Sequence, residues 1–158
     1  MNVKCLSVLA GVLILAGASS AYAQSDRAAA VARARGHAER NADVTLVGPD
    51  QTLVAQDVII DSDRSEHVRF ARTYRSLRVV GGDLVVHGTD SGAFLGVSQT
   101  LTSELALSTN AKLQSQGAIR QAVAQFAGQA ANARAEMVVY ARQLPALAYE
   151  VVVEGLKD

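Results

Sequence analysis

The feature that most constrains this chain is a stretch of period-two hydrophobic alternation in its middle. In residues 67–74, the apolar Val68, Phe70 and Tyr74 alternate with polar side chains. This pattern predicts a half-buried strand, because successive side chains of a strand point to opposite faces. A second apolar run at 79–87 predicts a partner strand, and the four residues between the two runs can reverse the chain.

Two consecutive glycines, Gly81 and Gly82, interrupt the second predicted strand. Glycine inside a strand indicates a β-bulge or a close approach of two backbones. A hairpin turn at the glycine pair itself is the alternative. The pattern alone leaves both interpretations open.

Shorter strand signals flank this pair. Leu53-Val54 and 58–60 are short strand candidates, a turn is expected at 88–92, and residues 93–100 can pair as a further strand. These elements predict an antiparallel sheet with one packed and one wet face.

The C-terminal third has a different pattern. Residues 101–112 form a polar, Ser/Thr-rich connector. A helix over 116–127 is expected, with Ser115 as its cap and an apolar stripe at Ile119, Ala122, Val123 and Phe126. Strands are expected at 135–141 and 147–154, separated by a break at Leu144-Pro145. The predicted fold class is therefore α+β, with an antiparallel sheet followed by a helix-plus-hairpin unit.

The first 23 residues have the features of a secretory signal peptide. Lys4 precedes an apolar run at 6–16, and Ala21 and Ala23 frame a small-x-small cleavage site that would make Gln24 the first mature residue. We therefore expect a secreted protein, extracellular or periplasmic, that has no membrane segment after cleavage. Cleavage would also remove the one cysteine, so packing without disulfides must hold the mature chain together.

The segment after the cleavage site predicts an Ala-rich helix over 27–41. Its apolar stripe is thin and Gly36 weakens it, so we expect a solvated linker helix. Charges balance at 15 basic and 15 acidic residues, which gives no reason to expect nucleic acid or an anionic membrane as partner.

No catalytic or metal-binding motif is present. The chain lacks H-E-x-x-H and G-x-S-x-G, so we expect no enzymatic activity from it. His67 and His87 are expected at the same end of the paired strands, but no third metal ligand is placed by the sequence, which favours surface or interface histidines over a metal site. Asp61 and Asp63 lack the Gly and distal Glu of a calcium loop.

An arginine series runs along the central segment and ends close to the glycine pair. It is interpreted equally well as a solvated face balanced by acids or as a surface for an acidic partner, since arginine forms bidentate pairs with carboxylates. Its members are Arg64, Arg69, Arg72, Arg75 and Arg78.

Residues 67–87 resemble the fungalysin/thermolysin propeptide (FTP) domain. They carry its ordered run of His-Val-Arg-Phe, Thr-Tyr, Gly-Gly-Asp and Val-Val-His. One departure is Ser76, where that family usually has Gly; serine can enter a type I turn, but a positive φ there would be strained. The resemblance implies partner contact or a structural role for a set of nine residues: His67, Arg69, Arg72, Tyr74, Arg75, Gly81, Gly82, Asp83 and His87.

The C-terminal part resembles a PepSY domain, through the 119–126 helix pattern and the Leu147 to Val151 strand pattern. The order FTP then PepSY is that of propeptides of thermolysin-family secreted zinc metallopeptidases. The expected division is a signal peptide at 1–23, a helix and linker at 24–52, an FTP-like domain at 53–100, a linker at 101–112 and a PepSY-like domain, incomplete at its C-terminus, at 113–158.

This resemblance implies a propeptide that assists folding of a catalytic domain and inhibits it until cleaved. The partner would be the cognate metallopeptidase domain, in cis or in trans, and zinc would belong to that domain and not to this chain. The alternative is a stand-alone secreted module that inhibits peptidases or acts in the cell envelope. A zinc motif encoded after codon 158 would favour the first interpretation, and a stop codon the second.

Overall fold

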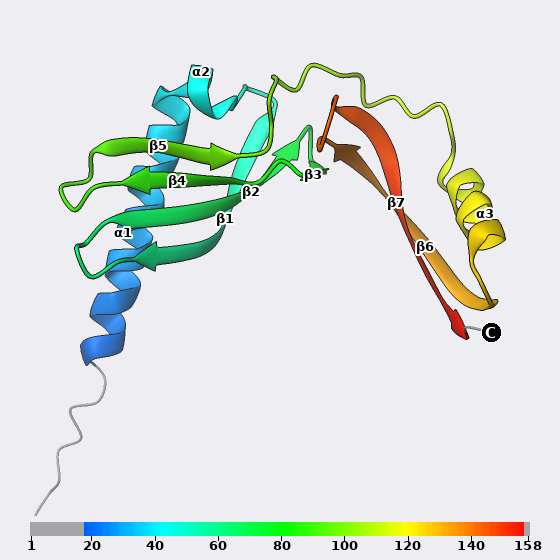
Figure 1. The fold of residues 1–158 in the computed structure, drawn as a ribbon, viewed down its shortest axis with the longest axis horizontal. Coiled ribbons are helices and arrows are strands. Elements are labelled where there is room, and N and C mark those ends of the chain that lie inside the picture. The colour runs from blue at the N-terminus through cyan, green and yellow to red at the C-terminus, as the bar shows by residue number, and fades with distance from the viewer. Residues whose placement is uncertain (1–17, 157–158) are drawn as a thin grey trace, which may run out of the picture.

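A computed structural model describes residues 18–156 as an arched α+β fold, in which one sheet runs the length of the molecule (Figure 1). The α+β class predicted from the sequence is confirmed. The elements are α1 (Ala18–Arg40), α2 (Ala42–Thr45), β1 (Gln51–Ile60), β2 (Glu66–Tyr74), β3 (Leu77–Val80), β4 (Leu84–Gly88), β5 (Phe94–Gln99), α3 (Ser115–Gln125), β6 (Gln129–Tyr140) and β7 (Ala146–Leu156).

The alternation that dominates the sequence forms the central strand. β2 pairs antiparallel with β1 on one edge and with β3 and β4 on the other, and the sheet continues as β5-β4-β2-β3-β6-β7. Val68, Phe70 and Tyr74 are at most 2% exposed, as the period-two pattern predicts. We call the strands β1, β2, β4 and β5 the N-terminal sheet, and α3, β6 and β7 the C-terminal unit.

The first strand is longer than expected. The sequence indicates two short strands near Leu53 and Val58, whereas β1 is continuous over both. Its pairing with β2 shifts register between Ala55 and Asp57. A β-bulge therefore hides the continuity, because the extra residue interrupts the alternation that identifies a strand.

The glycine pair lies in a bulge and not in a hairpin turn. Phe70 pairs with Leu84 and Thr73 pairs with Arg78, so β3 and β4 both lie on the same edge of β2. Residues 79–83 loop out opposite only two residues of β2. The bulge interpretation is thus supported, and the alternative of a turn that reverses the chain at the glycines is wrong.

The bulge also joins the two parts of the molecule. Val79 and Val80 pair in parallel with Val139 and Tyr140 of β6, while every other pairing in the described sheet is antiparallel. The expectation of a purely antiparallel sheet is therefore corrected. The residues that leave the β2 ladder are free to form this second ladder.

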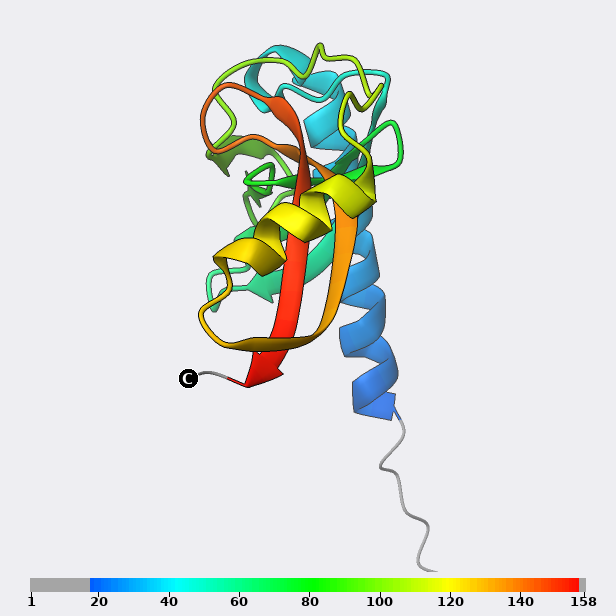
Figure 2. The same ribbon diagram turned by 90° about the vertical axis from the view of Figure 1, so that its right-hand side faces the viewer.

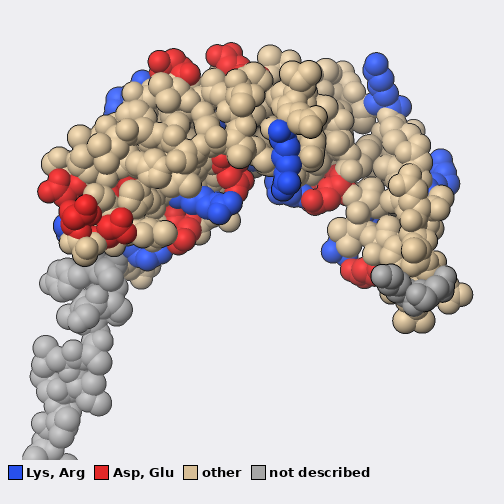
Figure 3. Space-filling view, viewed as in Figure 1, with Lys and Arg blue, Asp and Glu red and all other residues tan. Residues whose placement is uncertain are grey.

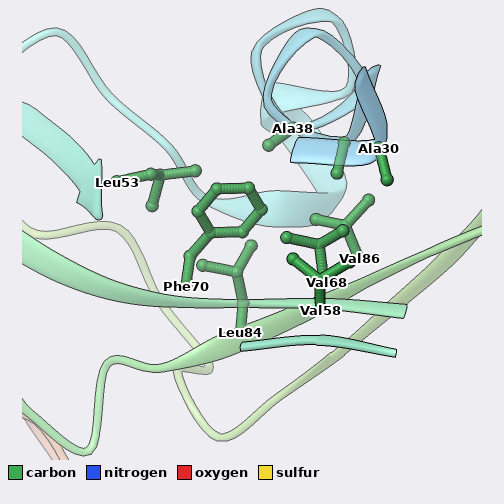
Figure 4. Packing of buried hydrophobic residues seen from close by; sticks show 9 residues of the cluster. Ala30, Ala38, Leu53, Val58, Val68, Phe70, Leu84 and Val86 are labelled. Carbon is green, nitrogen blue, oxygen red and sulfur yellow. The ribbon is translucent and has the colours of Figure 1, made fainter. Parts of the chain in front are cut away.

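Helix α1 lies across one face of the N-terminal sheet and is part of its core (Figure 4). Ala30 and Ala38 are fully buried, and Ala34 is 5% exposed. The expectation of a solvated linker helix is wrong, because small side chains let a helix approach a sheet closely even when its apolar stripe is thin. The strand residues in this cluster are Leu53, Val58, Val68, Phe70, Leu84 and Val86.

The C-terminal unit is a long β6–β7 hairpin with α3 lying along it (Figure 2). Gln114, and not the expected Ser115, is the N-cap of α3, and it makes no side-chain cap bond. The predicted apolar stripe is only partly buried, and Val123 is 37% exposed. The deepest positions of the helix are Gly117 and Ala118, and Gly117 lies against the Leu113 side chain before the helix.

The connector between the two parts has no regular structure, as expected, but it is not fully solvated. Leu101 and Leu105 are 3% and 7% exposed. They form a second buried cluster at the junction with Tyr74, Val79 and Val139. Two leucines therefore anchor this segment to the core, although its composition is mainly polar.

Most of the predicted signal peptide lies outside the described residues. The predicted cleavage site at Ala21, Ala23 and Gln24 falls within the first turns of α1, and export remains a prediction. None of the described helices is long and apolar enough to cross a membrane.

Candidate interaction site

Four of the nine candidate residues gather on the sheet face opposite α1. Since Val68 and Phe70 pack toward α1, the alternate residues His67 and Arg69 point to the other side. His87 pairs in register with His67. We call this surface the open face and define it by His67, Arg69, Asp83, Val85, His87 and Ser98.

His67 and His87 form a cross-strand pair, at the common strand end that the sequence predicts. Their Nδ1 atoms are 2.7 Å apart. His67 Nε2 lies 3.0 Å from Asp61 Oδ2, and His87 Nε2 lies 2.9 Å from Ser98 Oγ. Burial and the neighbouring His67 lower the pKa of His87 below its usual 6.5. No group of three or more His, Cys, Asp or Glu that could hold a metal occurs in residues 18–156.

Arg69 and Asp83 lie further along the same face and form an ion pair at 2.7 Å. Both side chains border a groove of about 680 Å³ between the open face and the turn that joins β6 to β7. Its other lining residues are Gly81, Leu84, Val85, Ser98, Gln99, Thr100 and Arg142. The groove thus combines apolar walls with polar side chains.

Arg72 does not belong to this surface. It is fully buried, so its inclusion in an exposed arginine series is wrong. The guanidinium donates only to oxygens of uncharged groups, and burial lowers its pKa to about 10, so it is charged at neutral pH. Its acceptors are the carbonyls of Thr45, Leu46 and Gly82 and the side-chain oxygens of Gln51 and Gln99, at 2.7–3.2 Å.

These five bonds make Arg72 a structural centre. They tie β2 to the end of α2 and the residue after it, to the start of β1, to the glycine bulge and to β5. A buried guanidinium needs this complete set of acceptors, because a buried charged donor without partners is costly.

Tyr74 and Arg75 also have structural roles. Tyr74 is 2% exposed, and its hydroxyl donates to the Leu107 carbonyl at 3.1 Å, which fixes the connector. Arg75 pairs with Asp50 at 2.9 Å and its guanidinium lies over the Tyr74 ring. The hydrogen bond that Arg75 donates to the Asp50 carboxylate raises the pKa of Arg75.

Both glycines of the bulge lie where a larger residue would clash with its neighbours. Gly81 has φ +82°, and a Cβ there would lie 2.7 Å from Arg142 Cγ. A Cβ at Gly82 would lie 2.5 Å from Val79 Cγ1. The close backbone approach that the sequence offers as one interpretation is therefore present at Gly81, where the backbone nitrogen of Arg142 would lie 3.2 Å from the added Cβ. At Gly82 the space is taken by a side chain of the bulge itself.

Most of the arginine series is balanced by acids. Arg69 and Arg75 pair as described, and Arg78 lies 3.2 Å from Glu136 and also bonds to Glu150. Basic and acidic side chains accordingly interleave along the underside of the arch (Figure 3). This supports the interpretation as a charge-balanced face.

Sequence reasoning missed Arg142 and Ser98. Arg142 follows β6 and reaches the groove, with no carboxylate within ion-pair distance among the described residues. Ser98 reaches the histidine pair because β5 pairs with β4. The alternation within 93–100 could have placed Ser98 on the polar face, but nothing local could have placed Arg142 beside a bulge far away in the chain.

Residues 51–101 match the family described as "Fungalysin/Thermolysin Propeptide Motif". A transglutaminase-activating metalloprotease of Streptomyces mobaraensis is 37% identical over 119 residues. That alignment covers 71% of this chain but 16% of the relative, so the chain spans a small part of the relative's length.

Proposed function

Since this chain carries an FTP propeptide domain, we propose that it is the inhibitory and folding-assisting propeptide region of a thermolysin-type zinc metalloendopeptidase precursor. Its partner is the cognate catalytic domain, which supplies the zinc. Export through the predicted signal peptide, and a PepSY-like identity for the C-terminal unit, belong to the same proposal.

The observation that carries this proposal is the exposure of one side of the propeptide sheet. Helix α1 covers one face, whereas the open face and its groove are uncovered in the described chain. The ion pair and hydrogen bonds on the open face hold its polar side chains in fixed positions. A rigid surface of this kind can stabilise the folded catalytic domain by binding it and can cover the substrate cleft.

Inhibition in trans tests the proposal. The probe is the mature catalytic domain of the Streptomyces mobaraensis relative, assayed on casein with increasing amounts of the full chain. We expect dose-dependent inhibition and a higher yield when the denatured catalytic domain is refolded with the chain. Absence of both effects would contradict the proposal.

A matched pair of charge reversals locates the contact. Arg142→Glu changes an arginine of the groove, and Arg120→Glu changes an exposed arginine of α3 on another surface. We expect Arg142→Glu to weaken inhibition by about tenfold, as reversal of an interfacial charge does, and Arg120→Glu to leave it unchanged. Equal effects of both would show that the groove is not the contact surface.

A further inference from the structure

The histidine pair on the open face is the centre of a continuous hydrogen-bonded chain. It runs from Ser98 through His87 and His67 to Asp61, with three successive contacts of 2.9, 2.7 and 3.0 Å. The four residues come from β5, β4, β2 and the turn between β1 and β2. The chain therefore crosses one whole end of the N-terminal sheet.

The donor and acceptor capacities of the four side chains determine where the protons lie when both histidines are neutral. The Asp61 carboxylate only accepts, so His67 donates from Nε2, and its Nδ1 must then accept from His87. The remaining His87 nitrogen, Nε2, accepts from the Ser98 hydroxyl. Every donor then faces an acceptor.

One added proton fits this arrangement, but a second does not. A single imidazolium can still donate from Nδ1 to the neutral ring opposite, and Asp61 offsets its charge. When both rings are protonated, each Nδ1 carries a hydrogen, and two donors cannot remain 2.7 Å apart. The second proton must therefore separate the rings.

The surroundings do not supply a counter-charge for two imidazoliums. Asp61 contacts only the outer nitrogen of His67, and Ser98 beside His87 is uncharged. The strand neighbours across the sheet are Ile59 on β1 and Gly96 on β5. The other charged groups nearby are Asp63 in the turn, whose pKa lies below its usual value because Ser65 donates to it, and Asp57, Arg69 and Asp83 one row along the face.

The pair lies between two turns that α1 also holds. Arg33 of α1 bonds to Glu66, the residue before His67. His37 of α1 lies 2.9 Å from the Gly92 carbonyl, in the turn that follows His87 and β4. Separation of the rings would thus loosen the end of the sheet where α1 and both turns meet.

We propose that His67 and His87 form an acid-sensitive latch, in which the doubly protonated pair opens and weakens the N-terminal sheet. Its consequence for regulation rests on the proposed function: acidification would loosen the propeptide and release the catalytic domain. The latch itself depends only on the geometry of this chain.

The sign of the effect follows from linkage. In the folded state the pKa of His87 lies below 6.5, so between that lower value and 6.5 the unfolded chain binds more protons. Stability contributed by the neutral ring is present above pH 6.5 and is lost as the pH falls through the folded pKa.

Urea unfolding of the full chain at about pH 7.5 and about pH 5 tests the latch, since histidine changes charge in this range. We expect the urea midpoint of the wild type to be lower at the acidic pH. For His87→Gln we expect a much smaller difference between the midpoints at the two pH values. His37→Gln, which removes the histidine of α1 and its contact with Gly92 at both pH values, serves as the control: its midpoint should fall on acidification by as much as that of wild type. An equal loss in His87→Gln and wild type would overturn the proposal.

An NMR titration of the wild-type chain covers the case in which His87→Gln does not fold. We expect the His87 ring to titrate below 6.5, and protonation of both rings to coincide with faster amide exchange in residues 61–67 and 87–93. If the two rings titrate independently of each other and amide exchange in these two segments does not become faster, the latch is refuted. Measuring protease inhibition at both pH values separates the two proposals. If the chain does not inhibit at either pH, the proposed function alone is contradicted. If the histidine pair opens in acid but inhibition is unchanged, the proposed regulation of inhibition by pH is contradicted.

Discussion

At the scale of single residues, the tip of the β2–β3 hairpin has backbone strain. Tyr74 pairs with Leu77, so Arg75 and Ser76 form a two-residue loop, and their φ angles are 48° and 68°. Positive φ at both positions is typical of a type I′ turn and not of the type I turn that serine can enter, so Ser76 has the positive φ that the sequence predicts to be strained. The loop adopts this geometry because its twist matches that of the strands.

Ser76→Gly should therefore stabilise the chain by about 1 kcal/mol. Glycine removes the left-handed penalty of an L-residue, about 1–2 kcal/mol, at an entropic cost of about 0.5–1 kcal/mol. The measurement is the free energy of unfolding in urea. Ser76→Ala is the control and should give no gain; a glycine variant no more stable than this control would show that the turn is unstrained.

Arg72 shows what residue-level reasoning can and cannot provide. Its position, two residues after Phe70 and two before Tyr74, already places it in phase with the buried face. Its charge, by contrast, favoured a solvent-exposed position. The five oxygens that accept hydrogen bonds from its guanidinium come from four separate segments of the chain. The alternation thus indicated the burial, whereas the acceptors depend on tertiary structure.

At the scale of elements, period-two patterns located most of the strands, because alternation is a local signal. They failed at the bulge in β1 and at the break between β3 and β4, where the spacing changes. The parallel partner of β3 could not be predicted, since β6 lies far along the chain. For α1, the sequence predicted a helix but not its docking, because alanine gives a weak amphipathic signal.

A pair of substitutions on α1 tests its role in the core. Ala34→Asp places an unpaired carboxylate at a position that is 5% exposed, whereas Ala32→Asp makes the same change on the exposed side. We expect Ala34→Asp to lower the free energy of unfolding by about 3 kcal/mol or more, and Ala32→Asp by well under about 1 kcal/mol. Circular dichroism during urea unfolding gives both values. Similar small losses for both would mean that α1 is not docked in solution.

At the scale of the whole molecule, the core is distributed unevenly. One buried cluster lies between α1 and the N-terminal sheet, and the other lies at the junction. In the described chain, α3, β6 and β7 form no buried cluster of their own. The C-terminal unit therefore depends on the junction for its stability.

Because the C-terminal unit is stabilised at the junction, amide hydrogen exchange in its strands should become faster with distance from the junction. We expect slow exchange in β2 and β4, intermediate exchange near Val138 and Val139, which are at most 2% exposed, and the fastest strand exchange near Gln129 and Leu156. Native-state exchange followed by mass spectrometry or NMR measures it. Uniformly slow exchange along β6 and β7 would contradict a C-terminal unit stabilised mainly from one end.

The short parallel ladder between β3 and β6 has a consequence for the order of folding. Contacts across it join distant positions; Arg78 and Glu136 are 58 residues apart. Closing so large a loop is entropically costly, and high contact order slows folding. The β2–β3 hairpin and the β6–β7 hairpin each form from neighbouring segments, so the ladder is a late event. A folding trajectory would pass through a stage in which the first sheet is assembled while the arch is still open.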